Sequence, residues 1–175
     1  AREYGAEIPF LRPKELSDDF TGAGAVVSHA LSFLQNQGEK YDFVCGLYAT
    51  APLLQSKYLV EGFQKLKDSD AVKSFSATSM PFPIQRTFKI TQNNRCEMFW
   101  PENFYKRSQD LEEAYQDAGQ FWWVKLSKTS DEIMFGKDSI PIVLPRYLVQ
   151  DIDTLEDWER AEVLYEVLKR QKKIS

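Results

Sequence analysis

The chain has 175 residues, of which 43% are hydrophobic, and this is enough for one well-buried domain without disulfide or metal staples. Its formal net charge of −4, with no block rich in Lys and Arg, gives no electrostatic surface for nucleic acid. No apolar run approaches the length of a membrane span, and no signal peptide is visible. Cys45 and Cys96 lack metal-ligand spacing, so we expect free thiols in a reducing cytoplasm.

The first five residues resemble the end of a helix. Ala1-Arg2-Glu3-Tyr4 is followed by Gly5, and glycine is typical of the position just after a helix. Four residues are too few to form a helix alone. We therefore hypothesise that a natural N-terminal segment precedes residue 1, and a start codon immediately before Ala1 would contradict this.

Helical and extended patterns alternate in the first half of the chain. A helix is expected over residues 23–37, where the single histidine, His29, has a structural role among apolar side chains. Residues 41–48 have the near-continuous apolar character of a buried central strand. A second helix over about 56–67 and a strand over 71–76 follow.

The character of the chain changes between residues 77 and 111. Three prolines and a scatter of positive charge indicate an inserted excursion, with strands near 87–90 and 96–100. The alternation then resumes with four elements: a strand over 119–124, a helix to about residue 135, a strand over 140–144 and a final helix from Thr154.

The pattern as a whole predicts an α/β fold with a mostly parallel sheet and helices on both faces. We expect the core to consist of residues 1–76 and 112–175, separated by the excursion 77–111. The first core part would carry the nucleotide site, and the second would end in the C-terminal helix.

Two carboxylates stand where an extended run gives way to the final helix. Side chains two apart on a strand share a face, so Asp151 and Asp153 are expected to form a pair, with Ile152 toward the core. Such a pair suits Mg²⁺, which binds through one or two carboxylates plus substrate phosphates. The alternative is that Asp153 or Thr154 caps the helix, because both fit the capping-box pattern.

The ordered series of motifs resembles the cytidylyltransferases that activate nine-carbon acidic sugars, the CMP-sialic acid synthetase family. The resemblance covers nearly the whole chain and is closest to the pseudaminic acid branch. The motifs that carry it are Arg12-Pro-x-Glu-Leu, Leu47-Tyr-Ala-Thr-Ala-Pro-Leu53, Pro81-Phe-Pro-Ile-Gln-Arg86, Arg107-Ser-Gln-Asp-Leu111, Asp117-Ala-Gly-Gln-Phe121 and Asp151-Ile-Asp153.

The resemblance implies a Rossmann-like nucleotidyltransferase fold that binds CTP at the carboxyl ends of its strands. Arg12 matches a residue that contacts the cytosine, with an ion pair to Glu15 as the alternative. The loop Thr21, Gly22 and Ala23 would lie against the same base, and Tyr48 would add to the CTP site.

The resemblance also implies roles for the acidic residues. Asp151 and Asp153 match the family's metal ligands and would hold Mg²⁺ between the α-phosphate of CTP and the sugar hydroxyl. Nucleotidyl transfer depends on in-line positioning and on neutralised phosphate charge. The catalytic residues expected in this chain are therefore Asp151 and Asp153.

For the acidic sugar, the resemblance implies a guanidinium partner for the carboxylate. Arg107 matches this role, with Gln109 and Asp117 as hydrogen-bonding groups and Tyr48, Phe121 and Trp122 as walls. The alternatives are an ion pair of Arg107 with Asp110 and a core position for the aromatic residues. In the family, the excursion mediates dimerisation and reaches the neighbouring active site, so a homodimer is expected.

The family's N-terminal strand and its Gly/Ser/Lys-rich phosphate loop are not found in these 175 residues. We therefore expect the chain as given to be catalytically inactive, because the triphosphate would lose its main backbone and Lys contacts.

The leading hypothesis is a cytoplasmic, Mg²⁺-dependent enzyme that makes CMP-pseudaminic acid and pyrophosphate for glycosylation of a bacterial surface or flagellar protein. One alternative is the same chemistry on legionaminic or N-acetylneuraminic acid. The other is a non-catalytic α/β module that binds a nucleotide or a partner protein.

Overall fold

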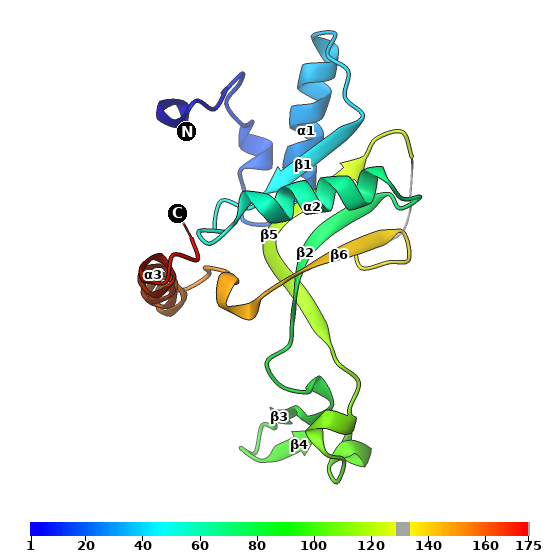
Figure 1. The fold of residues 1–175 in the computed structure, drawn as a ribbon, viewed down its shortest axis with the longest axis vertical. Coiled ribbons are helices and arrows are strands. Elements are labelled where there is room, and N and C mark those ends of the chain that lie inside the picture. The colour runs from blue at the N-terminus through cyan, green and yellow to red at the C-terminus, as the bar shows by residue number, and fades with distance from the viewer. Residues whose placement is uncertain (129–133, 175) are drawn as a thin grey trace.

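A four-stranded sheet forms the centre of the computed structural model, which describes residues 1–128 and 134–174 (Figure 1). Its strands lie in the order β1-β5-β2-β6. The bounds are Phe43–Leu47 for β1, Lys73–Ser79 for β2, Tyr115–Lys125 for β5 and Ser139–Leu144 for β6. The apolar runs predicted as strands are therefore strands.

The sheet is mixed rather than mostly parallel in its pairings. β5 pairs antiparallel with both β1 and β2, whereas β2 and β6 pair in parallel. β1, β2 and β6 thus share one direction, as predicted, and β5 opposes them. The reason is the connection: β2 and β5 form a long hairpin, which joins antiparallel neighbours without a crossover helix.

Helices cover both faces of the sheet, as predicted. α2 (Ser56–Lys67) lies on one face, where Ser74 Oγ donates to the carbonyl of Gly62 at 2.9 Å. The core on this face contains Phe121, Ile142 and Leu144. α1 (Ala23–Asn36) lies on the other face, where Ala23 and Val27 pack against Phe75, Ala77 and Trp122.

The C-terminal helix α3 (Leu155–Arg170) follows directly after the acidic segment. Its inner side contributes Leu168 to a third core cluster, together with Leu53, Leu148 and Ile174. No helix among the described residues is long and apolar enough to cross a membrane.

The excursion is the tip of the β2–β5 hairpin and projects away from the helices (Figure 1). It contains a two-stranded antiparallel ribbon of β3 (Phe88–Ile90) and β4 (Cys96–Met98), near the predicted positions. The proposed division at residues 77 and 111 stays a prediction.

One predicted helix is wrong where the structure describes it. Residues 126–128 and 134–138 form turns and bends between β5 and β6, not a helix ending near residue 135. Residues 129–133 lie outside the described residues. Short apolar stretches next to a strand do not distinguish a helix from turns.

Candidate active site

β5 loses its regular register beside the acidic segment. Phe75 pairs with Trp122, but the next pair is Ala77 with Asp117. Ser76 alone lies between these pairs on β2, whereas residues 118–121 lie between them on β5. Gly119 within this bulge has a φ of +61°, a conformation that favours glycine.

Polar side chains accept hydrogen bonds from the backbone N–H groups of the bulge. Asp117 Oδ1 accepts from the backbone N–H of Gly119 at 3.0 Å. Ser76 Oγ accepts from the N–H groups of Gln120 and Phe121 at 3.1 and 3.2 Å. The bulge is therefore a built feature of the strand.

The carboxylate of Asp151 lies directly over this bulge. A Cβ added to Gly119 would be 3.1 Å from Oδ2 of Asp151 and 3.3 Å from its Cγ. Asp151 Oδ1 accepts from the N–H of Ile152 at 3.1 Å. The segment that carries Asp151 is irregular rather than a strand, so the predicted alternation of faces does not decide where Asp153 points.

The capping alternative is resolved in favour of Thr154. Thr154 Oγ1 accepts from the N–H of Asp157 at 3.2 Å, and Asp157 Oδ2 accepts from the N–H of Thr154 at 3.0 Å. These bonds form the capping box of α3. Asp153 contributes its backbone N–H to Asp157, and its exposed carboxylate is not the cap.

Tyr48 lies near the carboxylates of Asp117 and Asp151. Its ring packs against Trp122 with a centroid distance of 5.0 Å, and its backbone N–H donates to the carbonyl of Gln120 at 3.0 Å. Burial raises the pKa of the Tyr48 hydroxyl, and the negative charges of Asp117 and Asp151 raise it further. The structure thus brings together three of the residues singled out from the sequence: Tyr48, Asp117 and Asp151.

The residues expected at the cytosine lie at the start of α1. Gly22 is the N-cap position and Ala23 packs toward the cluster of Trp122. The N–H of Thr21 donates to Oδ1 of Asp18 at 2.6 Å. Hydrogen bonds from Thr21, then from the N–H of Phe20, hold the pKa of Asp18 below its usual value.

Arg12 is exposed and makes a different contact from the ion pair considered as its alternative. Its Nε donates to Oγ of Ser17 at 3.2 Å, and Ser17 in turn donates to the carbonyl of Pro13 at 2.8 Å. The guanidinium charge also lowers the pKa of Asp18 slightly, as the last of several causes. The loop that carries Arg12 is thus ordered by its own polar side chains.

Arg107 and Gln109 lie on the excursion, apart from the bulge of the same chain (Figure 1). Arg107 makes a two-point ion pair with Asp110, with Nε to Oδ2 at 2.7 Å and Nη2 to Oδ1 at 2.9 Å. This is the alternative considered for Arg107. Within one chain, the structure does not bring Arg107 or Gln109 to Asp151.

Phe121 takes the core position that was the alternative to a wall of the sugar site. Its side chain is 1% exposed and belongs to the core beneath α2. Trp122 is also buried, on the opposite face, where it packs against Gly46 of β1 and Tyr48. A continuous apolar run such as 121–124 does not show which of its side chains reach the surface.

A cavity of about 570 Å³ lies over the sheet and is lined in part by Asp117. Asp117 and Gln116 supply its polar groups, and this size and composition suit a small ligand. Its remaining lining residues are mostly apolar: Phe75, Ala77, Tyr115, Phe135, Pro141 and Val143. Asp117 is therefore shared by the cavity and by the cluster with Tyr48.

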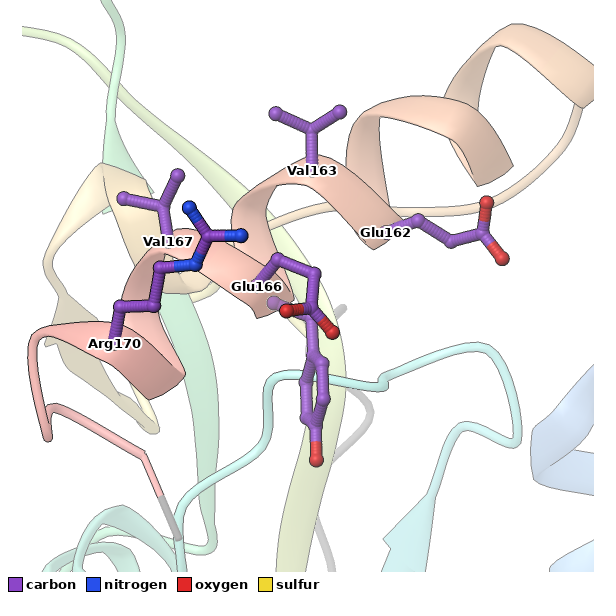
Figure 2. Close-up of a pocket in the computed structure, with 6 residues that line it drawn as sticks. Glu162, Val163, Glu166, Val167 and Arg170 are labelled. Atoms are coloured by element: carbon purple, nitrogen blue, oxygen red, sulfur yellow. The ribbon is translucent and has the colours of Figure 1, made fainter.

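A second hollow of similar volume lies on the outer side of α3 (Figure 2). All six of its lining residues, including Val163, Glu166 and Arg170, come from this one helix. Because no second element contributes a converging polar group, we do not place the active site there.

The acidic segment supplies carboxylates of the kind that a hard cation takes, and Asp151 is the one that lies over the bulge. Asp151 and Asp153 offer carboxylate oxygens, the ligands that Mg²⁺ takes one or two at a time while it keeps waters and substrate phosphates. No group of three or more His, Cys, Asp or Glu side chains suited to a metal occurs among the described residues. An ion held by one or two carboxylates would therefore need water and substrate oxygens to complete its coordination.

Sequence reasoning missed Ser76, Gly119 and Gln120, which build the bulge. Gly119 inside an apolar strand pattern was the available sign, because a glycine there suggests a bulge or a close approach of another chain segment. Ser76 and Gln120 carry no such sign, since their contacts depend on the register between β2 and β5.

No protein-family model matches the chain. A pseudaminic acid cytidylyltransferase of Campylobacter jejuni is 44% identical over 168 residues, which are 95% of this chain and 72% of that protein. A Helicobacter pylori protein named pseudaminic acid cytidylyltransferase and UDP-2,4-diacetamido-2,4,6-trideoxy-beta-L-altropyranose hydrolase is 31% identical over 153 residues, or 87% of this chain and 29% of that protein. An N-acylneuraminate cytidylyltransferase of Escherichia coli is 25% identical over 176 residues, or 98% of this chain and 40% of that protein.

These similarities agree with the motifs found in the sequence. Identity is higher to the Campylobacter jejuni pseudaminic acid enzyme than to the Escherichia coli N-acylneuraminate enzyme. The match to the former covers 95% of the chain. The chain belongs to the pseudaminic acid cytidylyltransferase family.

Proposed function

We propose that the protein transfers CMP from CTP to pseudaminic acid, with release of pyrophosphate. The observation that carries this proposal is the cluster of Tyr48, Asp117 and Asp151 beside a ligand-sized cavity, in a chain 44% identical to a pseudaminic acid cytidylyltransferase. The product would serve glycosylation of a bacterial surface or flagellar protein. The need for CTP supports a cytoplasmic site of action.

Asp151 and Asp153 would hold a Mg²⁺ ion. The ion would neutralise phosphate charge and favour ionisation of the attacking hydroxyl. Asp151 is held over Gly119, while Asp153 stays free of the helix cap, so both carboxylates remain available as ligands.

The CTP base would lie at the start of α1, where Arg12 and the segment 21–23 are found, with Tyr48 nearby. Ala23 packs against the core cluster that contains Trp122, and the Tyr48 ring packs on Trp122, so both parts of this proposed subsite border the same cluster. Arg12 would have to leave Ser17 to reach a base, an exposed hydrogen bond of small net free energy.

The sugar would occupy the cavity that Asp117 lines. Its apolar wall suits methyl and acetamido groups, and Asp117 and Gln116 can receive hydrogen bonds from N–H or O–H groups.

The carboxylate of the sugar would be bound by Arg107 of a second copy in a homodimer. Arg107 lies on the projecting excursion, so its own chain cannot supply it to Asp151 in this arrangement. The excursion exposes a set of large apolar side chains, which is typical of an interface. They are Phe82, Phe88, Ile90, Phe99, Trp100, Phe104 and Tyr105.

The test is pyrophosphate release by the full natural chain, given CTP, Mg²⁺ and a panel of nonulosonic acids. We expect release with pseudaminic acid, and loss of at least ~10²-fold in rate for Asp151→Asn or Asp153→Asn. Asp68→Asn, an exposed acid at the end of α2, is the matched control and should retain the wild-type rate.

Release with another acid alone would reassign the substrate within the same chemistry. No release with any acid from folded protein, together with unchanged Mg²⁺-dependent CTP binding in the double Asn variant, would favour the non-catalytic module.

A further inference from the structure

Gln120 is a buried polar residue with no role in the proposed chemistry. Its side chain is 1% exposed, and its Nε2 donates to the carbonyl of Leu148 at 2.5 Å. Leu148 ends the short 3-10 turn that precedes the acidic segment, three residues before Asp151. The amide thus joins β5 to the chain segment that carries Asp151.

The two ends of this hydrogen bond are themselves fixed. On β5, the backbone of Gln120 donates to Ser76 Oγ and accepts from the N–H of Tyr48. On the other side, Leu148 is 2% exposed and packs with Leu53 and Leu168. Because both segments are rigid, this hydrogen bond fixes the position of the Leu148 segment relative to β5.

A second glutamine fixes the far end of the acidic segment. Gln150 Nε2 donates to the carbonyl of Asp151 at 2.8 Å and to Oδ1 of Asp157, in the capping box of α3, at 3.0 Å. Asp151 therefore lies between a tie to β5 and a tie to α3. Of these two connections, the hydrogen bond from Gln120 is the one that starts in the bulge beneath the Asp151 carboxylate.

We propose that Gln120 is a positioning residue, which holds the Asp151 segment against the Gly119 bulge and so sets the geometry of the metal-binding carboxylate. This inference rests on the proposed role of Asp151. The Gln120 side chain acts only as a donor, through Nε2, because its Oε1 has no hydrogen-bond partner among the described residues. Removing the amide therefore breaks one hydrogen bond and no wider network.

The experiment is Gln120→Met in the full natural chain, which keeps the side-chain volume and removes the donor. Affinity for Mn²⁺ in the presence of CTP is measured from the electron paramagnetic resonance signal of free Mn²⁺. We expect affinity to fall about tenfold or more, the usual effect of losing a hydrogen bond that orients a metal ligand. The Mg²⁺ concentration for half-maximal rate should rise by a similar factor.

Thr78→Val is the matched control. Thr78 Oγ1 donates to the carbonyl of Leu144 at 2.9 Å, a buried bond of the same kind on β2 that does not reach the acidic segment. It should lower the melting temperature comparably and leave Mn²⁺ affinity unchanged. If Gln120→Met does not fold, Gln120→Asn keeps the amide but is too short to reach Leu148, and should show the same loss.

Three outcomes decide the inference. Wild-type Mn²⁺ affinity in a folded Gln120 variant, with weakened affinity in Asp151→Asn, overturns the positioning role alone. An equal loss in Thr78→Val also overturns it, because the effect would then be general loosening. Unchanged affinity in Asp151→Asn would instead overturn the proposed metal site, and the inference with it.

Discussion

Gly119 adopts a φ of +61°, and a Cβ there would lie 3.1 Å from the carboxylate of Asp151. Gly119→Ala should therefore cost about 1–2 kcal/mol of unfolding free energy through the left-handed backbone. It should also lower the rate of pyrophosphate release, because the methyl group displaces the carboxylate. Urea unfolding and steady-state kinetics measure the two effects.

Gly38 is the control for the cost of placing a residue with a Cβ at a positive φ. It has a φ of +92°, but a Cβ there meets nothing within 4 Å. Gly38→Ala should lose similar stability and keep the wild-type rate. A normal rate in Gly119→Ala would show that Asp151 moves aside without consequence, and would contradict the proposed role of this close approach.

Gly46 faces the indole of Trp122 across the β1–β5 pair. A Cβ on Gly46 would overlap that ring, which is held between Tyr48 and the core. Gly46→Ala should therefore destabilise the protein by about 1–3 kcal/mol through overpacking. The shift of the urea midpoint measures it.

An alanine at Gly24 should change the stability in the opposite direction. It lies within α1 and a Cβ there has open space, so Gly24→Ala should stabilise by about 0.5–1 kcal/mol. Equal effects at positions 24 and 46 would mean that the indole of Trp122 yields, against the packing described here.

Which residues matter could be predicted from the sequence better than what they contact. Thr154 was one of two possible caps, and only the structure chooses it over Asp153. Arg107 had two possible partners, and Asp110 is the one it meets within its own chain. Phe121 and Trp122 are adjacent on a strand and so face opposite sides of the sheet, but only the structure shows that both sides are buried.

At the scale of elements, the capping box of α3 predicts a pH dependence of stability. A hydrogen bond from Thr154, and others from the backbone and Gln150, hold the pKa of Asp157 below its unfolded value of 3.8. A lowered folded pKa contributes stability above the unfolded pKa, and this is lost as pH falls through the folded pKa. Asp157→Asn should therefore lower the melting temperature near pH 7, and the difference should shrink below about pH 4.

Thr154→Ala tests the cause. Because the side-chain bond from Thr154 is the largest single contribution to the shift, the pH-dependent difference should be smaller in that background. A difference of the same size in both backgrounds, measured by thermal unfolding between pH 2.5 and 7, would assign the effect to another contact of Asp157.

Elements that depend on local sequence could be predicted, and elements that depend on distant pairing could not. The bounds predicted for the second helix, 56–67, agree with α2, because its apolar periodicity and flanks are local. The direction of β5 was not predictable, since it depends on the chain returning through the excursion to pair with β2. The bulge depends on that register in turn, so the site's central feature was out of reach of sequence patterns.

At the scale of the whole molecule, the structure separates residues that the proposed reaction needs together. Asp151 lies over Gly119 of β5, whereas Arg107 belongs to the excursion, which projects away from the helices (Figure 1). If the excursion of one copy completes the site of the other, each active site combines Asp151 of one chain with Arg107 of its partner. The exposed aromatic side chains of the excursion, such as Phe82 and Tyr105, support such an interface.

Mixing two inactive variants tests this arrangement. Asp151→Asn and Arg107→Ala should each be inactive as homodimers. In a mixed dimer, one site receives both substitutions and the other receives neither, so subunit exchange should restore about a quarter of the wild-type activity. If Arg107 acts within its own chain, every site in the mixture keeps one substitution and no activity returns. Pyrophosphate release before and after exchange therefore distinguishes a site shared between copies from one built within a single chain.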